Sequence, residues 1–406
     1  MKTDLLADRH IGIQEADLPA MLEKIGVKSL DELINKTIPS KIRLKEPLAL
    51  AAPMTEREFA EHIAGLASLN KIYTSYIGMG WYDTITPAVI QRNVFENPAW
   101  YTSYTPYQTE VSQGRLEALL NFQTVISDLT AMPLANCSLL DEATAAAEAA
   151  TMMYGLRSRD QQKKGTNVLF VDESIFPQNL AVIQTRVIPQ GMKIQVGNYK
   201  ELEFTPEIFA CIIQYPNASG SVEDYREFVE KAHAANCKVA VDADILSLAL
   251  LLPPGEWGAD IVFGSTQRLG IPLFYGGPSA AYFATRDEYK RNMPGRIIGL
   301  SKDKYGKICY RMALQTREQH IKREKATSNI CTAQALLATM AGFYAVYHGQ
   351  EGIKNIAKRI HSIATWLNKA LARLGYVQHN EIFFDTLRFS LPDHVSAQKA
   401  PHNCIE

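Results

Sequence analysis

An acidic residue at the end of an apolar run is the first feature of this sequence that could do chemistry. Residues 238–242 read Lys-Val-Ala-Val-Asp and predict a short buried strand that ends on Asp242. Ligands of open α/β sheets bind at the carboxyl ends of the strands, and in pyridoxal-phosphate enzymes an aspartate pairs with the pyridinium nitrogen of the cofactor. A helix N-cap or a solvated strand end explains the same pattern equally well, so the spacing leaves both interpretations open.

The loop after the next predicted strand is where such an enzyme would keep the lysine that binds its cofactor covalently. Residues 263–270 read Phe-Gly-Ser-Thr-Gln-Arg-Leu-Gly, and no lysine occurs anywhere in residues 239–289. Arg268 cannot replace that lysine because its guanidinium stays protonated. As members of a polar loop, Gln267 and Arg268 need no function of their own. The pattern therefore disfavours a chain that holds pyridoxal phosphate by itself.

A third candidate is a polar stretch ahead of an apolar helix that we expect from residue 335 onward. Thr327, Ser328 and Asn329 offer three hydrogen-bond donors, and basic side chains precede them at Lys322, Arg323 and Lys325. Helix N-termini with such donors bind anions such as phosphate. A capped helix with a solvated basic face is the other explanation, and composition alone favours it.

A glycine-rich turn that would cradle a phosphate is missing from the corresponding place in the sequence. Residues 136–143 read Asn-Cys-Ser-Leu-Leu-Asp-Glu-Ala, with leucines and acids instead of glycines. Asp141 would repel a phosphate, and we expect it to act as the N-cap of a structural helix.

The elements that must position these residues alternate along the chain. Strands are predicted at 167–172, 193–196, 209–214, 238–242, 261–263 and 280–284, with helices between them. Continuous apolar strands separated by helices predict a mostly parallel sheet with helices on both faces. The large α/β domain should span residues 71–345 and include an aromatic loop at 73–110.

Smaller units are expected on either side of that domain. Residues 1–70 predict a helical arm, with Ser29 as an N-cap and a capping box formed by Thr55 and Glu58. A long helical region at 321–374 and a strand at 383–391 follow the large domain. Residues 346–406 therefore predict a small C-terminal α+β domain that is incomplete, because one helix and one strand cannot cover a sheet.

Composition excludes several classes of protein. The 406 residues are 47% hydrophobic and 21% charged, with a formal net charge of −1, which argues against disorder and against recruitment by nucleic acid or membrane surfaces. No apolar run approaches the roughly 20 residues of a membrane span. The charged N-terminus favours a cytoplasmic protein, or one that has already been processed. The six cysteines lack zinc-type spacing and no HExxH motif occurs, so no metal site is expected.

Three longer motifs carry a resemblance to a known family. They are Tyr-Thr-Ser-Tyr-Thr-Pro-Tyr-Gln-Thr-Glu-Val-Ser-Gln-Gly at 101–114, Arg-His-Ile-Gly at 9–12, and Lys-Ala-Thr-Ser-Asn-Ile-Cys-Thr at 325–332. Together they resemble the P-protein of the glycine cleavage system, in its N-terminal half or first subunit, from residue 8 to about 398. The last eight or so residues do not resemble the family, and most of its small C-terminal domain is expected to be missing.

The resemblance implies a pyridoxal-phosphate-transferase fold of type I and an assembly of two such halves, of which the second holds the cofactor. It implies glycine decarboxylation and transfer of the aminomethyl group to the lipoyl arm of the H-protein. Tyr104, Tyr107 and Glu110 would then face the cofactor of the partner half, and Thr327, Ser328 and Asn329 would bind its phosphate. Asp242, Gln267 and Arg268 would be vestigial.

Two alternatives stay open on the sequence alone. The chain could be a scaffold that stabilises the partner half or docks the H-protein without reaching the active site. It could also be a self-sufficient pyridoxal-phosphate enzyme, which the absence of a lysine near residue 267 disfavours. In every case we expect a homo- or hetero-oligomer.

Overall fold

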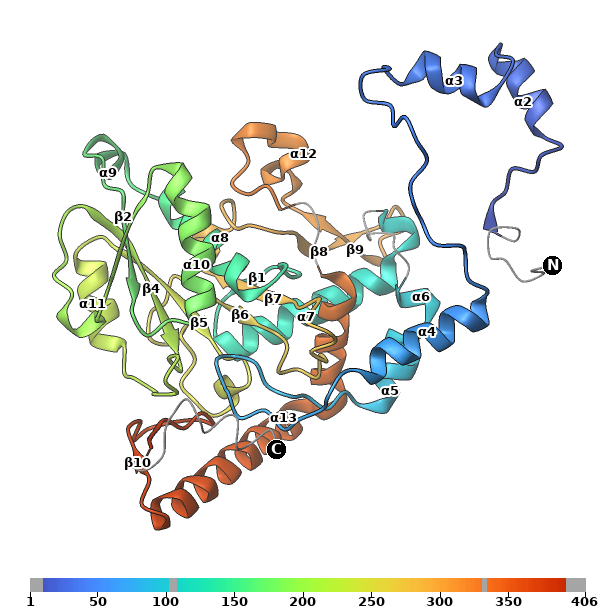
Figure 1. The fold of residues 1–406 in the computed structure, drawn as a ribbon. Helices are drawn as coiled ribbons and strands as arrows, with labels where there is room; N and C mark the ends of the chain where they lie inside the picture. Colours follow the sequence, from blue (N-terminus) through green and yellow to red (C-terminus); the bar gives the residue numbers. More distant parts are fainter. Residues whose placement is uncertain (1–9, 102–107, 331–333, 392–406) are drawn as a thin grey trace. The chain divides into compact units, whose positions relative to one another are not determined.

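The chain forms two compact units, residues 1–74 and 75–406, in a computed structural model that describes residues 10–101, 108–330 and 334–391 (Figure 1). The first unit contains the helices α2 (Leu18–Ile25), α3 (Leu30–Thr37) and α4 (Glu56–Ser68). The N-caps predicted for α3 and α4 are confirmed: the Ser29 side chain accepts a hydrogen bond from the Glu32 N–H, and Thr55 and Glu58 form a capping box.

A seven-stranded sheet organises the second unit. Its strand order is β1-β7-β6-β5-β4-β2-β3, and the four pairings among β3, β2, β4, β5 and β6 are parallel, whereas β7 pairs antiparallel with β6 and β1. The strands are β1 (Leu134–Ala135), β2 (Val168–Asp172), β3 (Lys193–Gly197), β4 (Ile208–Tyr215), β5 (Lys238–Ala243), β6 (Ile261–Ser265) and β7 (Ala281–Thr285). All six predicted strands are confirmed, and β1 adds a short edge that the sequence analysis missed.

Helices cover both faces of this sheet, as predicted. One apolar core lies beneath α8 (Glu142–Gly155) and α10 (Pro177–Val187). The other core lies beneath α7 (Gln113–Thr130), α11 (Arg226–Ala234) and the first part of α13 (Ala335–Arg373). Strand β4 illustrates the division, because Phe209 and Ile212 face the first core whereas Cys211 and Ile213 face the second.

A two-stranded hairpin that the sequence analysis missed projects from this layer structure. It pairs β8 (Ile297–Lys302) with β9 (Ile308–Ala313). Helix α7 binds both outer edges through amide side chains. Gln123 exchanges two hydrogen bonds with the backbone of Ile298, at 3.1 and 2.7 Å, and Gln113 does the same with Tyr310, at 2.9 and 2.8 Å.

The C-terminal part differs from the prediction in two respects. The helical region expected at 321–374 is divided into the short α12 (Gln319–Lys322) and α13, and α13 is interrupted at Gly349, whose φ of 65° lies in the left-handed region. The strand expected at 383–391 shrinks to β11 (Phe389–Ser390), which pairs with β10 (Val377–Gln378). The reason is that Asp385 and Thr386 bind the side chains of Arg268 and Tyr82 instead of forming a ladder, as described below.

Candidate functional site

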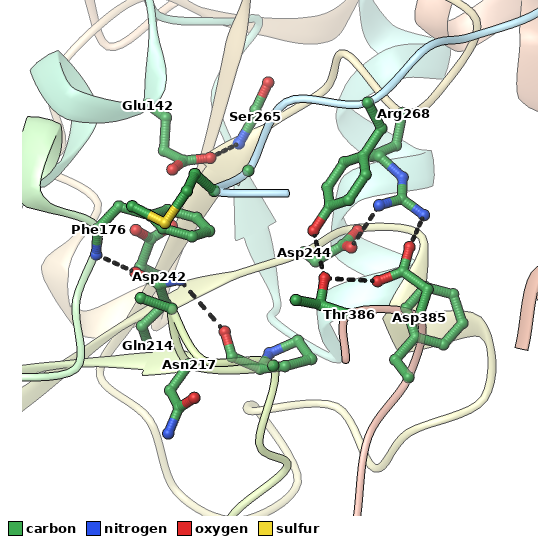
Figure 2. Close-up of a pocket in the computed structure, with 17 residues that line it drawn as sticks. Glu142, Phe176, Gln214, Asn217, Asp242, Asp244, Ser265, Arg268, Asp385 and Thr386 are labelled. Atoms are coloured by element: carbon green, nitrogen blue, oxygen red, sulfur yellow. Dashed lines mark hydrogen bonds and ion pairs between the residues drawn. The ribbon is translucent and has the colours of Figure 1, made fainter. Parts of the chain in front are cut away.

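A small cavity lies where the carboxyl ends of β4, β5 and β6 meet the N-terminus of α8 (Figure 2). Its volume is about 40 Å³, enough for a few water molecules. An extended segment of residues 75–87, here called the strap, and residues 384–386 contribute to its wall. The lining residues are Met79, Gly80, Tyr82, Glu142, Phe176, Gln214, Pro216, Asn217, Ala218, Gly220, Asp242, Asp244, Ser265, Arg268, Phe384, Asp385 and Thr386.

Asp242 lies at this edge of the sheet, as predicted. Its side chain is buried, with 2% exposed, and its Oδ2 accepts a hydrogen bond of 2.7 Å from the Asn179 amide. Burial, together with the nearby Glu142 carboxyl, raises the pKa of Asp242 well above its ordinary value. Asp242 is therefore neither a helix N-cap nor a solvated strand end, so both of the purely structural interpretations of its position are excluded.

Glu142, a residue that the sequence analysis passed over, shares the same partner. Its Oε1 accepts a 2.8 Å hydrogen bond from the Asn179 amide, and its Oε2 accepts a 3.0 Å hydrogen bond from the Ser265 N–H. Burial raises the pKa of Glu142 to about 7, against the opposing effect of the Asn179 and Ser265 hydrogen bonds. One amide thus joins two enclosed carboxyl groups across the cavity.

The neighbouring Asp141 has the capping role that the sequence predicted. Its carboxylate accepts hydrogen bonds from the Thr144 N–H at 2.7 Å and from the Thr144 hydroxyl at 2.9 Å. The helix that would cradle a phosphate is therefore closed by its own N-cap, and it directs the next acidic side chain into the cavity.

Arg268 occupies the loop in which a pyridoxal-phosphate enzyme would keep the lysine that binds its cofactor. The residue is 8% exposed. Its guanidinium forms ion pairs with Asp244 at 3.2 Å and with Asp385 at 2.6 Å, and it lies 4.0 Å from the centre of the Tyr82 ring. Three separate segments, the end of β5, the strap and residues 384–386, meet on this one side chain. Neither Asp244 nor Asp385 was singled out from the sequence, because each lies far along the chain from Arg268.

The strap is fastened to the loop that follows β6. The Gln267 side chain donates to the Tyr82 carbonyl at 2.7 Å, and the Thr84 and Thr86 hydroxyls donate to the carbonyls of Ile271 and Gly270 at 2.8 and 2.6 Å. The Tyr82 hydroxyl hydrogen-bonds the Thr386 hydroxyl at 2.8 Å. The first part of the predicted aromatic loop, residues 75–87, thus closes the pocket of its own chain.

Pyridoxal phosphate does not fit this pocket. A cavity of about 40 Å³ is several-fold smaller than the sites that hold small molecules. Glu142, the first residue of α8, lines the cavity together with Asp242 and Asp244, and these acidic side chains would repel a phosphate. Arg268 is engaged by two aspartates and cannot link covalently to the cofactor.

The other predicted cofactor-binding residues lie outside this pocket. Thr327, Ser328 and Asn329 belong to a loop between the turn Arg323–Lys325 and α13. The Ser328 hydroxyl accepts a 3.1 Å hydrogen bond from the Ile330 N–H. On α8, burial raises the pKa of the Glu148 carboxyl, and the nearby Ser328 hydroxyl and the Arg186 guanidinium oppose that shift.

Of the three residues predicted to contribute at an interface, the structure places Glu110. It borders a groove of about 710 Å³ between the start of α7 and the β8–β9 hairpin, away from the pocket around Asp242. The groove also carries the basic side chains of Lys302, Lys307 and Arg311. Tyr104 and Tyr107 lie outside the described residues.

Within residues 10–101, 108–330 and 334–391, no group of three or more His, Cys, Asp or Glu side chains is arranged to hold a metal ion. Across the same part of the chain, every helix is too short or too polar to cross a lipid bilayer.

Comparison with known proteins gives a consistent result. Residues 8–404 match the family model described as "Glycine cleavage system P-protein". The chain is 80% identical over 399 residues to glycine dehydrogenase (decarboxylating) of Bacteroides thetaiotaomicron, an alignment that covers 98% of this chain and 42% of that protein. The enzyme of the same name from Flavobacterium johnsoniae is 59% identical over 387 residues, 95% of this chain and 41% of that protein. The chain thus spans about two fifths of the length of these relatives.

Solved structures agree with these sequence matches. A crystal structure of glycine decarboxylase (P-protein) of the glycine cleavage system, in inhibitor-bound form, superimposes with a TM-score of 0.83 at 33% identity, covering 92% of this chain and 85% of that one. Alanine–glyoxylate aminotransferase from Nostoc, at a TM-score of 0.55 and 16% identity over 83% of this chain and 85% of that one, shares the fold alone. The predicted type I fold is thereby confirmed.

Proposed function

The chain belongs to the glycine cleavage system P-protein family, and from this premise we propose that it is the half of a glycine decarboxylase that carries no cofactor. In this proposal it completes the pyridoxal-phosphate site of a partner half. The partner's site decarboxylates glycine, and the aminomethyl group passes to the lipoyl arm of the H-protein.

The observation that carries this proposal is the state of the chain's own pocket. A cavity of about 40 Å³, lined by Glu142, Asp242 and Arg268, offers no room and no lysine for the cofactor. The fold is nevertheless shared with an enzyme whose structure was solved with pyridoxal phosphate. The lack of a usable site in a chain with this fold argues against the self-sufficient enzyme and supports a role at the site of another chain.

Two groups of residues are proposed to reach that partner site. Thr327, Ser328 and Asn329 would donate hydrogen bonds to the phosphate of the partner's cofactor, in a stretch whose upstream basic residues favour an anion. Tyr104, Tyr107 and Glu110 would contribute from the interface.

Reconstitution with the C-terminal half of a relative tests the proposal. We expect each half alone to be inactive and the mixture to decarboxylate glycine when lipoylated H-protein is the acceptor. Thr327→Val should weaken cofactor retention in the mixture about tenfold or more, because a hydrogen bond to a charged acceptor is lost, while the thermal midpoint of this chain stays unchanged.

The opposite outcome has an equally clear meaning. A lowered thermal midpoint with unchanged cofactor affinity would show that Thr327 serves only the local turn. If alanine at Tyr104, Tyr107 and Glu110 weakened assembly but left turnover per assembled complex intact, the chain would be a scaffold and not part of the active site.

A further inference from the structure

Arg323 has a backbone conformation that an arginine rarely adopts. It follows the short helix α12 with a φ of 53° and a ψ of −127°, a combination that glycine enters freely but that crowds the Cβ of other residues. The backbone is fixed there, because its N–H donates to the Gln319 carbonyl and its carbonyl accepts a 3.1 Å hydrogen bond from the Ala326 N–H. Such strain clusters at functional sites, where the surrounding structure imposes it. Glycine would fit this position at a lower cost, so the arginine side chain needs a reason of its own.

The start of α12 is held to the body of the second unit. Glu318, the residue before the helix, forms a buried ion pair with Arg296, and the buried Arg317 side chain donates to the Met293 carbonyl. Beyond this base the chain turns outward: Figure 1 shows α12 projecting from the helices around the sheet, and every residue from 319 to 325 is exposed. A fixed base thus presents the strained residue to whatever surrounds the chain.

The positive charge around Arg323 is not balanced by this chain. Residues 302–325 hold eight lysines and arginines but only three acids, whereas the whole chain has a formal net charge of −1. Within the part of the chain that the structure describes, the side chains of Lys322, Arg323 and Lys325 form no ion pair and no hydrogen bond. An exposed guanidinium that a strained backbone holds in place, without a carboxylate of its own chain, indicates an anionic partner from outside.

We infer that Arg323 binds an anionic group of the partner half, a phosphate or a carboxylate, and that its backbone strain is tolerated because of this contact. The inference rests on the proposed function and adds a residue to it, since Thr327 and Asn329, four and six positions later, are proposed to reach the same partner. A guanidinium pairs with either anion through two parallel hydrogen bonds, which the point charge of a lysine does not provide.

The thermal midpoint of the full chain alone tests the role of the strain. Arg323→Gly removes the strain together with the side chain, so we expect the midpoint to rise by about 1–3 °C. Lys322→Gly is the matched control: Lys322 is also exposed but has an ordinary φ of −78°, so glycine there should lower the midpoint. A midpoint that falls as far in R323G as in K322G would overturn the inference, because the arginine would then have no strain to justify.

Arg323→Gln tests the contact itself, because glutamine removes the charge and keeps the strained backbone. The probe is the C-terminal half of a relative, with and without pyridoxal phosphate, in sedimentation velocity and cofactor-release measurements. A partner carboxylate predicts association about tenfold or more weaker with both forms, whereas the cofactor phosphate predicts a loss of that size only in the loaded form, as weaker cofactor retention. Arg159→Gln, which removes an exposed arginine at the start of α9 (Arg159–Lys163), should change neither quantity by more than about threefold.

Unchanged association and unchanged cofactor retention in R323Q would overturn the inference even if the wild-type mixture decarboxylates glycine. A wild-type mixture that associates but does not decarboxylate glycine would instead contradict the proposed function. The association of R323Q still decides the inference in that case, because it is measured without turnover.

Discussion

At the scale of single residues, Arg268 connects three separate segments of this chain. With 8% of its surface exposed, it joins Asp244, Asp385 and the Tyr82 ring, and these residues come from separate segments. A buried ion pair contributes little net stability compared with apolar residues, but removing one partner leaves an uncompensated charge. The guanidinium therefore connects the end of β5, the strap and residues 384–386.

Arg268→Met should destabilise the chain by about 3–5 kcal/mol, because two enclosed aspartates lose their cation while the side-chain volume is nearly kept. Urea unfolding of the full chain measures the loss. Arg226→Met is the matched control: Arg226 pairs with Asp224 at 2.6 Å on an exposed surface, so its loss should cost at most about 1 kcal/mol. Equal losses of unfolding free energy in the two variants would show that the buried ion pairs of Arg268 stabilise the fold no more than an exposed pair does.

Glu142 should also leave a signature in the pH dependence of stability. Burial raises its pKa from 4.5 to about 7, and the Asp242, Asp244 and Asp141 carboxyls face it. Between these two pH values the folded chain holds a proton that the unfolded chain has lost, so the free energy of unfolding falls as pH rises. Glu142→Gln should remove up to about 3 kcal/mol of that decline between pH 4.5 and 7. A free energy of unfolding that declines by the same amount between pH 4.5 and 7 in E142Q and in the wild type would contradict this prediction.

Sequence patterns found the place of the pocket but not all of its residues. Asp242 was located because it ends a continuous apolar strand, a strictly local signal. Glu142 and Asp141 are adjacent acids, and which of them caps α8 depends on the residue at which the helix begins. Tyr82 and Thr386 meet although 304 positions separate them, and no local pattern encodes such a contact.

The secondary-structure elements show the same difference between local patterns, which the sequence predicts, and distant contacts, which it does not. The strands β2 and β4 to β7 are largely apolar runs, and β3 alternates apolar with polar residues. Turn residues flank these strands, so their positions followed from composition and length. The β8–β9 hairpin was missed because it is half exposed and contains Gly299, and because the partners of its outer edges are side chains on a helix. Gln123 lies 175 positions from Ile298. An amide that satisfies both backbone groups of one strand residue reads, in the sequence, as an ordinary helical glutamine.

At the scale of the whole molecule, the helices of the first unit carry apolar side chains that remain exposed. None of α2, α3 and α4 buries a residue. On α4 the side chains of Phe59, Ile63 and Leu66 recur at helical spacing and are 45–56% exposed. An apolar stripe of this kind on a soluble protein generally marks an interface. The proposed function supplies a partner, since this chain spans about two fifths of its relatives' length.

Association with the C-terminal half should therefore depend on the α4 stripe. Ile63→Glu places a charge in the middle of the stripe and should weaken association about tenfold or more, because burying an unpaired carboxylate costs several kcal/mol. Lys41→Glu, a charge change at an exposed position of the same unit, should leave the affinity within about threefold of the wild type. Sedimentation velocity on mixtures of the two halves measures both affinities. A chain that stays monomeric in the presence of the C-terminal half, or an I63E variant that associates as tightly as the wild type, would show that the stripe faces something other than the partner.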